Sequence, residues 1–177
     1  QYVPVVVKEH SKYLRLMSWG LVPSWTKDQS IGQKMINARS ETLTEKPSFK
    51  RPFTSRRCIV PATGFYEWAK ESRQKVPMHF VLRGNGLMGL AGLWDIWKPP
   101  DGGGRDFYSF TIITTSPNEL LSKVHNRMPV ILRQEDEDRW LDPSFKDTKE
   151  LLPMLKPYPA EAMEGYLESL KQHGEPI

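Results

Sequence analysis

The sequence is poor in cysteine and histidine, with one cysteine, Cys58, and four histidines among 177 residues. A single cysteine cannot form a disulfide within the chain, which excludes the disulfide-stabilised scaffolds of small secreted proteins. The histidines lack the spacing of zinc ligands, so the sequence predicts neither a metal nor another cofactor. We therefore expect a metal-free protein that works in a reducing compartment.

Long hydrophobic runs are also lacking. The longest candidates, residues 87–93 and 110–113, fall short of the roughly 18 to 20 apolar residues that a membrane-spanning helix needs. Neither an initiator methionine nor a signal-peptide pattern precedes the strand-like run at residues 2–7. We therefore expect no membrane association, and we expect a further segment upstream of Gln1.

What the chain does have is an ordinary globular composition, with 38% hydrophobic and 26% charged residues. A chain of this length buries roughly 70% of the surface that its unfolded form exposes, which is enough for a stable core without disulfides or metal ions. The expectation is a single domain over residues 1–177, present as a monomer.

Charge is spread unevenly along the chain. Residues 1–83 carry 15 Lys and Arg against 6 Asp and Glu, whereas residues 84–177 carry 10 against 15. The basic half is a candidate surface for a polyanion, and aromatic residues lie between its cations, a combination that suits single-stranded nucleic acid. A solvated surface without a partner is the alternative. The cations are Lys27, Lys34, Arg39, Lys46, Lys50, Arg51, Arg56 and Arg57, and the aromatic residues are Trp19, Trp25, Phe49 and Phe53.

Strand-like segments, rich in β-branched and aromatic residues and bounded by Gly, Pro or Asp, dominate the chain. Helical segments are fewer, and no regular strand-helix-strand rhythm recurs. The pattern predicts an α+β fold, with a curved, largely antiparallel β-sheet or barrel-like core and short interspersed helices. The run from Pro99 to Gly104 is expected to be a loop between two strands. The expected strands are residues 3–7, 14–19, 57–61, 65–69, 78–82, 87–94, 107–115 and 129–132, and the expected helices are residues 40–45, 116–125, 135–141, 149–155 and 160–170.

Glu67 lies in the aromatic strand-like segment of residues 64–68. Strand alternation places its carboxylate on the same face as Phe65 and Ala69. If that face is buried, desolvation raises the pKa of Glu67 toward neutrality and suits it to general acid–base catalysis. The alternative is that its two neighbours face the core and Glu67 faces solvent.

His125 follows a short amphipathic helix and precedes a strand, a place where sites are assembled. A histidine that titrates near neutral pH can transfer protons there, and Arg127 could hold a phosphate. Alternatively, His125 caps the C-terminus of the helix. Asn37 could orient a substrate or an amine through its amide, or it could cap a helix.

Five short runs carry the most specific signal. They are residues 19–25 (WGLVPSW), 36–42 (INARSET), 57–68 (RCIVPA leading to GFYEW), 91–94 (AGLW) and 125–130 (HNRMPV). In order and spacing they closely resemble the SRAP (SOS response-associated peptidase) family. The resemblance extends from about Gln1 to Gly165, and the residues after Gly165 depart from the family's usual closing segment.

The resemblance implies a protein that recognises abasic sites in single-stranded DNA and becomes covalently linked to them. In the family, an N-terminal cysteine in a Met-Cys-Gly-Arg start reacts with the aldehyde of the opened abasic sugar. Its α-amine forms an imine, and its thiol then closes a thiazolidine ring. The resemblance further implies lyase activity through the same imine, self-processing peptidase activity, and action on DNA in a bacterial or phage-type cytoplasmic setting.

The family's functional residues carry over by position in these motifs. Asn37 matches the asparagine that positions the terminal amine, Glu67 the carboxylate that transfers protons, and His125 the histidine that assists it. Arg39 and Arg127 match arginines that grip phosphates beside the lesion.

Aromatic side chains complete the expected site. Trp25 and Trp68 are candidate platforms for a base beside the lesion, because a missing base leaves a stacking gap that an aromatic ring can fill. Trp19 is expected in the core.

The family's N-terminal cysteine is missing from the sequence, so we expect the nucleophile in a segment that precedes Gln1. Cys58 does not replace it, because it lies in an apolar strand, lacks an α-amine and is expected to be buried. Two other functions stay open. One is a non-covalent module for single-stranded DNA, whose affinity falls with salt. The other is a general protein hydrolase, for which the sequence offers no evident nucleophile.

Overall fold

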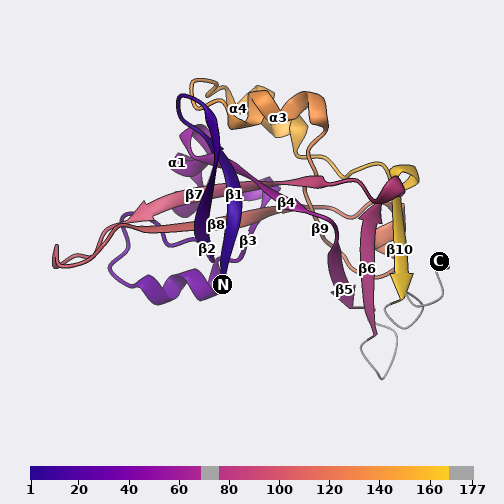
Figure 1. Cartoon of the computed structure of the whole chain (residues 1–177), viewed down its shortest axis with the longest axis horizontal. Coiled ribbons are helices and arrows are strands. Elements are labelled where there is room, and N and C mark those ends of the chain that lie inside the picture. Colours follow the sequence, from indigo (N-terminus) through magenta and orange to yellow (C-terminus); the bar gives the residue numbers. More distant parts are fainter. Residues whose placement is uncertain (69–75, 168–177) are drawn as a thin grey trace.

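The computed structural model describes residues 1–68 and 76–167, and β-strands form most of its framework (Figure 1). The strands belong to two sheets, and short helices connect and cover them. The strands are β1 (Tyr2–Lys8), β2 (Lys12–Trp19), β3 (Asn37–Arg39), β4 (Arg57–Ala62), β5 (Phe65–Trp68), β6 (Pro77–Leu82), β7 (Met88–Trp97), β8 (Phe107–Thr115), β9 (Met128–Pro129) and β10 (Met163–Leu167). The α-helices are α1 (Pro47–Ser55), α2 (Glu119–Ser122), α3 (Gln134–Leu141) and α4 (Thr148–Leu151). The short 3₁₀ turns are Gln29–Lys34, Ser40–Thr42, Arg83–Asn85, Leu152–Met154 and Ala160–Ala162.

The larger sheet has seven strands in the order β2-β1-β4-β7-β8-β3, with β9 paired to β8. Most neighbours run antiparallel, and the parallel pairs are β3 with β8 and the end of β2 with β8. The contact of Ser18 and Trp19 with Ser109 and Phe110 brings β2 back to β8, so the sheet curls without forming a closed barrel. The α+β fold with a curved, largely antiparallel sheet is therefore confirmed.

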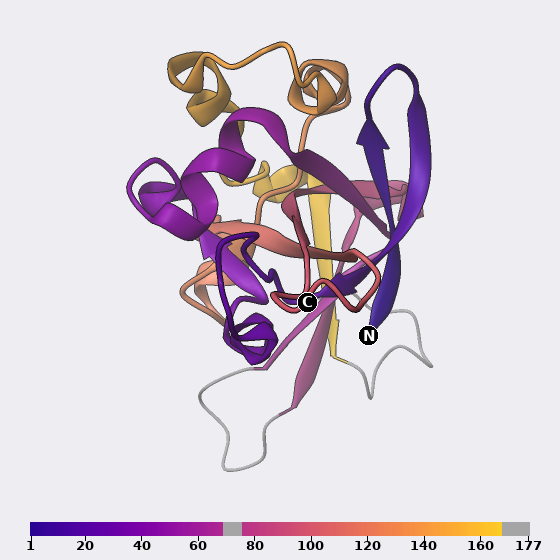
Figure 2. The same cartoon turned by 90° about the vertical axis from the view of Figure 1, so that its left-hand side faces the viewer.

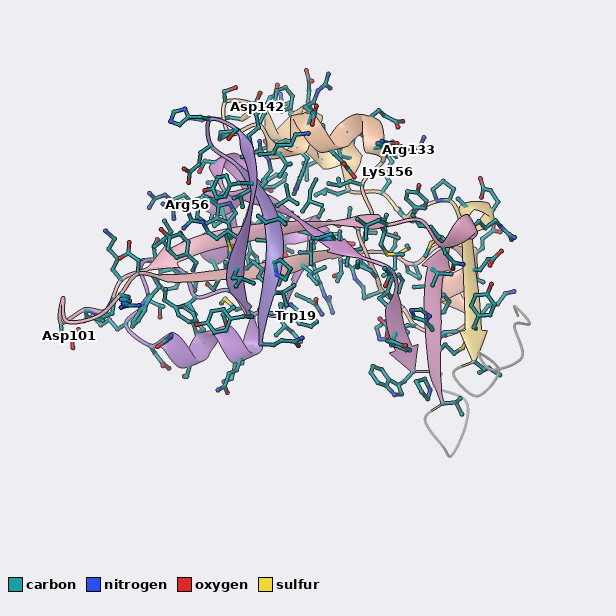
Figure 3. The ribbon with its side chains drawn as sticks, in the orientation of Figure 1. Trp19, Arg56, Asp101, Arg133, Asp142 and Lys156 are labelled. Atoms are coloured by element: carbon teal, nitrogen blue, oxygen red, sulfur yellow. The ribbon has the colours of Figure 1, made fainter. Side chains whose placement is uncertain are left out.

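Strand β7 lies in the interior of the large sheet, between β4 and β8. Nine of its ten residues are buried, because both faces of the strand are covered. One hydrophobic cluster joins β4 and β7 to α1 and α3, where Phe53 and Trp140 are buried. Helices α3 and α4 (orange) cover this end of the molecule in both views (Figure 1, Figure 2). The expected loop at residues 99–104 connects β7 to β8, and Asp101 lies at its tip (Figure 3).

The smaller sheet consists of β5, β6 and β10 and lies at the opposite end of the molecule from that loop (Figure 1). The helix expected at residues 160–170 is wrong, because a 3₁₀ turn leads there into β10, which pairs with β6. Gly165 lies against the ring of Phe80, and a Cβ added to it would lie 2.8 Å from that ring. A residue without a side chain, poor in a helix, is what this strand contact requires. Residues 168–170 of the expected helix lie outside the described residues.

Helix α1 was not expected, because Pro47 and Pro52 obscure its pattern. Pro47 sits at the first helical positions, where a proline fits, and the helix accommodates Pro52 in its interior. The other expected helices near the site are shorter in the structure than in the sequence-based expectation: α2 covers four residues, and a 3₁₀ turn replaces the helix at residues 40–45.

Arg57 is buried, so its expected place on a basic surface is wrong. Its guanidinium donates hydrogen bonds to the carbonyl oxygens of Phe53, Trp140, Asp142 and Phe145. These carbonyls lie near the C-terminal ends of α1 and α3, where helices leave acceptors unpaired. Arg57 therefore ties both helices to β4. Phe49 and Phe53 are buried as well, which removes them from the candidate stacking residues.

Among the described residues, no helix is both long enough and apolar enough to cross a membrane.

Candidate active site

A cleft of about 530 Å³ lies between the edge of the large sheet and the small sheet. Its walls come from the end of β2, from β3 and β8, from β5 of the small sheet, and from the segment that leads into β9. Six of the seven residues expected at a site line this cleft together: Asn37, Arg39, Glu67, Trp68, His125 and Arg127. The remaining one, Trp25, is not among the lining residues.

Glu67 faces the cleft from β5, with its side chain 21% exposed. Its neighbours Tyr66 and Trp68 are 43% and 51% exposed, so the alternative in which they face the core and Glu67 faces solvent is wrong. Burial raises the pKa of the Glu67 carboxyl, and the nearby His125 opposes this shift by favouring the charged form. A carboxyl group whose pKa is raised holds its proton to higher pH than an exposed one, which suits it to donate a proton as well as to accept one.

His125 lies three residues beyond the end of α2 and faces Glu67 across the cleft. Its Nδ1 lies 3.8 Å from Oε1 of Glu67. The same Nδ1 lies 3.1 Å from both the amide nitrogen and the carbonyl oxygen of Arg127. The ring is therefore held by the main chain two residues further on, and the expected alternative, a cap on the helix C-terminus, does not describe its hydrogen bonding.

Asn37 begins β3, which runs parallel to β8 and pairs Asn37 with Ile112. Its side chain is exposed and lines the cleft. The alternative role as a helix cap is wrong, because the residue before the following 3₁₀ turn is Arg39. The neighbouring Ile36 carbonyl accepts hydrogen bonds from the Trp19 indole and from the Ile112 amide, which fixes this end of β3.

The two candidate arginines differ sharply in their surroundings. Arg39 is exposed, and its guanidinium makes no hydrogen bond or ion pair with any residue in the described ranges. Arg127 is only 19% exposed, and both of its terminal nitrogens donate to the carboxylate of Glu41, at 2.7 and 2.9 Å. Arg127 also donates to the carbonyl oxygen of Thr114 at 2.6 Å.

Two tryptophans, Trp19 and Trp68, line the cleft. Trp68 is 51% exposed at the cleft, and Trp19, expected in the core, is instead 37% exposed and lines the cleft, so that expectation is wrong. Figure 3 shows Trp19 at the lower end of the β1–β2 hairpin, on the side toward the small sheet. Trp19 stacks on Phe110 with their ring centroids 6.4 Å apart.

Trp25 is exposed on the loop after β2. Two buried side chains hold this loop: Asp95 accepts a hydrogen bond from the Ser24 amide at 2.8 Å, and the Trp97 indole donates to the Thr26 carbonyl at 2.9 Å. Arg56 completes the anchor by pairing with Asp95. The loop therefore presents Trp25 from a fixed base.

Cys58 is fully buried in β4, as expected. Burial raises the pKa of its thiol well above the ordinary value, so the reactive thiolate is suppressed. No group of three or more His, Cys, Asp or Glu side chains that could hold a metal ion occurs within residues 1–68 and 76–167.

Sequence reasoning missed Glu41 and Thr114, which hold Arg127. Glu41 lies in the run at residues 36–42, two residues after Arg39, but its partner is 86 residues away in the sequence. A contact of that separation leaves no local signal, and the exposed polar character of Glu41 gave no reason to single it out.

Comparison with known proteins places this arrangement in a family. The profile of "SOS response associated peptidase (SRAP)" matches residues 1–169. The abasic site processing protein YoqW of Bacillus subtilis is 50% identical over 151 residues, a match that covers 85% of this chain and 66% of that protein. The abasic site processing protein HMCES of Xenopus tropicalis is 35% identical, over 82% of this chain and 50% of that protein. The chain thus spans about two thirds or less of the length of these relatives.

Solved structures agree in fold. A crystal structure of a protein from Bacteroides thetaiotaomicron has a TM-score of 0.88 and 33% sequence identity, and the match covers 98% of this chain and 77% of that one. A protein from Bordetella bronchiseptica gives a TM-score of 0.81 at 27% identity, over 94% of this chain and 83% of that one. On the profile match and the identities together, the chain belongs to the SRAP family.

Proposed function

We propose that this protein recognises abasic sites in single-stranded DNA and forms a covalent cross-link with them as part of a DNA damage response. The observation that carries the proposal is the Glu67–His125 pair, 3.8 Å apart in a cleft that is also lined by Arg39, a cation with no ion-pair partner within residues 1–68 and 76–167. Proton-transfer groups beside an exposed guanidinium suit a substrate that carries both a reactive carbonyl and phosphates. The names of the relatives, abasic site processing proteins, point to the same substrate.

The chemistry needs an amine, a thiol and proton transfer. Opening the abasic sugar exposes an aldehyde, and an α-amine adds to it and loses water to form an imine. A neighbouring thiol then adds to the imine carbon while its proton passes to the nitrogen, which closes a thiazolidine ring. Glu67 and His125 serve as the acid and base in these steps, and the Asn37 amide orients the amine. The same imine would allow strand cleavage by elimination.

The nucleophile in this proposal is an N-terminal cysteine upstream of Gln1. Its place beside the cleft is supported by Gln1, whose carbonyl oxygen accepts a hydrogen bond from the amide of the cleft residue Trp19 at 2.9 Å. Cys58 is unsuitable, because it is buried and its thiol has a raised pKa.

DNA binding in this proposal combines charge and stacking. Arg39 contacts a phosphate, because its guanidinium is exposed and unpaired within the described ranges, and Arg127 contributes positive charge deeper in the cleft. The exposed rings of Trp68 and Trp25 offer stacking surfaces for bases beside the lesion. The protein acts as a monomer.

The test compares two proteins on a denaturing gel with single-stranded DNA that carries one abasic site. One is the chain of residues 1–177, and the other carries a Met-Cys-Gly-Arg start before Gln1, with its initiator methionine removed. We expect a heat-stable band only from the second protein, and none when its new cysteine is replaced by serine. A shorter labelled DNA fragment in the same lanes would reveal lyase activity.

Two results would contradict the cross-linking proposal. A heat-stable band from residues 1–177 alone would assign the nucleophile elsewhere. No band from either protein, with salt-sensitive binding in a native gel, would favour a non-covalent module for single-stranded DNA, a function that the exposed Arg39 also suits.

A further inference from the structure

The guanidinium of Arg127 is held on two sides by residues to which the proposed chemistry assigns no role. Glu41 takes the outer edge of the guanidinium with both carboxylate oxygens, at 2.7 and 2.9 Å. Thr114 takes the inner edge, where its carbonyl oxygen lies 2.6 Å from Nη2 and its hydroxyl lies 3.4 Å from Nε. Only a small part of the hydrogen-bonding capacity of Arg127 therefore remains for a ligand.

The main chain of Arg127 in turn holds His125. Both the amide nitrogen and the carbonyl oxygen of Arg127 lie 3.1 Å from Nδ1 of the ring. A neutral ring accepts a hydrogen bond from the amide and carries its proton on Nε2, and a protonated ring can donate from Nδ1 to the carbonyl. The orientation of the ring toward Glu67 thus depends on where the Arg127 backbone lies.

We propose that Glu41 is a positioning residue: by clamping Arg127, it fixes the turn at residues 125–127 and so holds the His125 ring in place opposite Glu67. This inference rests on the proposed function for its catalytic consequence. Glu41 itself lies on the 3₁₀ turn after β3, and its partner segment lies 86 residues further along the chain, so the clamp joins two separate walls of the cleft.

The geometry sets this pair apart from an ordinary surface ion pair. Exposed single contacts between flexible side chains contribute little, because holding them in place costs entropy. Here the contact is bidentate, and Arg127 is 19% exposed and also fixed by Thr114. A planar fork on a carboxylate restricts orientation as well as distance. The pair is therefore suited to hold a backbone segment still.

The test uses single-turnover kinetics of the protein that carries the Met-Cys-Gly-Arg start. Glu41→Gln keeps the shape of the side chain and removes its charge. Glu45→Gln is the matched control, because Glu45 is exposed four residues away and forms no ion pair with a described residue. We expect Glu41→Gln to lower the cross-linking rate at saturating DNA about 10- to 100-fold, the scale of a small misplacement of a reacting group. The Kd for DNA should stay within about threefold.

Two further measurements separate positioning from other roles. In a His125→Ala background, Glu41→Gln should have no additional effect on the rate, because the two residues act as one unit. Glu41→Asp, which keeps the charge on a shorter arm, should recover part of the rate. Equal rates for Glu41→Gln and Glu45→Gln would overturn the proposal, and so would a full additional loss in the His125→Ala background.

A readout without DNA keeps this inference distinct from the proposed function. Hydrogen exchange of the Arg127 amide, measured by NMR on residues 1–177, should be about tenfold or more faster in Glu41→Gln than in Glu45→Gln, at matched unfolding temperatures. If no protein forms a cross-link but this exchange difference is present, the proposed chemistry fails and the clamp stands. If the exchange rates are equal, the clamp fails whatever the gel shows.

Discussion

Oε1 of Glu67 and Nδ1 of His125 lie 3.8 Å apart, although Glu67 lies in β5, His125 lies between α2 and β9, and the two residues are 58 positions apart in the sequence. This separation is too long for a hydrogen bond but short enough for the imidazole to influence the ionisation of the carboxyl group. Burial of the carboxyl and its attraction to the imidazole act in opposite directions on the pKa of Glu67. A pair balanced in this way can exchange a proton with a substrate placed between the two groups.

Glu67→Gln should slow cross-linking without weakening DNA binding. The substitution removes a proton carrier and no phosphate contact, so the single-turnover rate should fall about 10²- to 10⁴-fold while Kd stays within about twofold. Glu135→Gln, on the exposed surface of α3, is the control for loss of one negative charge. A large rise in Kd for Glu67→Gln would contradict the role of Glu67 as an acid–base group.

The raised pKa of Glu67 also predicts a gain in stability on its removal. A carboxyl whose pKa is higher in the folded state than in the unfolded state binds protons more readily when folded. Stability therefore falls as pH rises from the unfolded pKa, near 4.5, through the folded pKa, and the cost is fully present above it. Glu67→Gln should unfold at a higher temperature than the wild type at pH 7, and the difference should shrink by pH 4. An unchanged melting temperature at pH 7 would contradict this.

Arg39→Ala should weaken DNA binding and leave the reaction step intact. Loss of one phosphate contact should raise Kd and reduce the slope of log Kd against log salt by about 0.7, the value for single-stranded DNA. Arg105→Ala, on the exposed loop between β7 and β8, removes a cation away from the cleft and should change neither quantity appreciably. Fluorescence anisotropy at several salt concentrations measures both, and an unchanged slope for Arg39→Ala would contradict a phosphate contact.

The pair of Glu41 and Arg127 should persist far into the acid range. Hydrogen bonding from Arg127 lowers the pKa of Glu41 to about 2, below the unfolded value near 4.5. The stabilisation is fully present above pH 4.5 and is lost as pH falls toward 2. The difference in melting temperature between wild type and Glu41→Gln should therefore be constant from pH 7 to pH 5 and disappear near pH 2. A difference that vanished already at pH 5 would show that the pair does not form as described.

Asp95→Ala should loosen the loop that carries Trp25. The substitution leaves the Ser24 amide and the Arg56 guanidinium without their buried acceptor, at a cost of about 1–3 kcal/mol. Asp106→Ala, which breaks only an exposed 3.9 Å pair with Lys98, should cost less than about 1 kcal/mol. Urea unfolding measures the two costs. Equal costs would show that the buried anchor contributes no more than a surface pair.

Much of the fold was predictable because its strands follow local rules. Runs of β-branched and aromatic residues bounded by turns produced β1, β4, β7 and β8 close to their observed bounds. The two wrong predictions have different causes. The sequence of β10 suggests a helix, but the segment pairs with the edge of β6 as a strand. The prolines of α1 obscure the helical pattern of that segment. In β10, tertiary pairing overrides the local propensity.

For the site, the sequence predicted which residues lie together but not the surroundings of the two arginines. Motif residues such as Asn37, Glu67 and His125 do meet in one cleft. The surroundings of each cation were not predictable, because whether a guanidinium is exposed, like that of Arg39, or held by an ion pair, like that of Arg127, depends on residues distant in the sequence. Long-range pairs of this kind are absent from any local pattern.

Glu67 lies on the small sheet and His125 lies on the segment between α2 and β9, so the hydrophobic core that connects these two parts also influences the reaction. The cluster that contains Met78 and Phe80 of β6 also contains Leu121 and Met128, which flank His125 in the sequence. The packing of these side chains sets how far apart Glu67 and His125 stand. A cavity created there, for example by Phe80→Ala, would change this distance and therefore the cross-linking rate, although Phe80 lies in the hydrophobic core and does not contact the DNA.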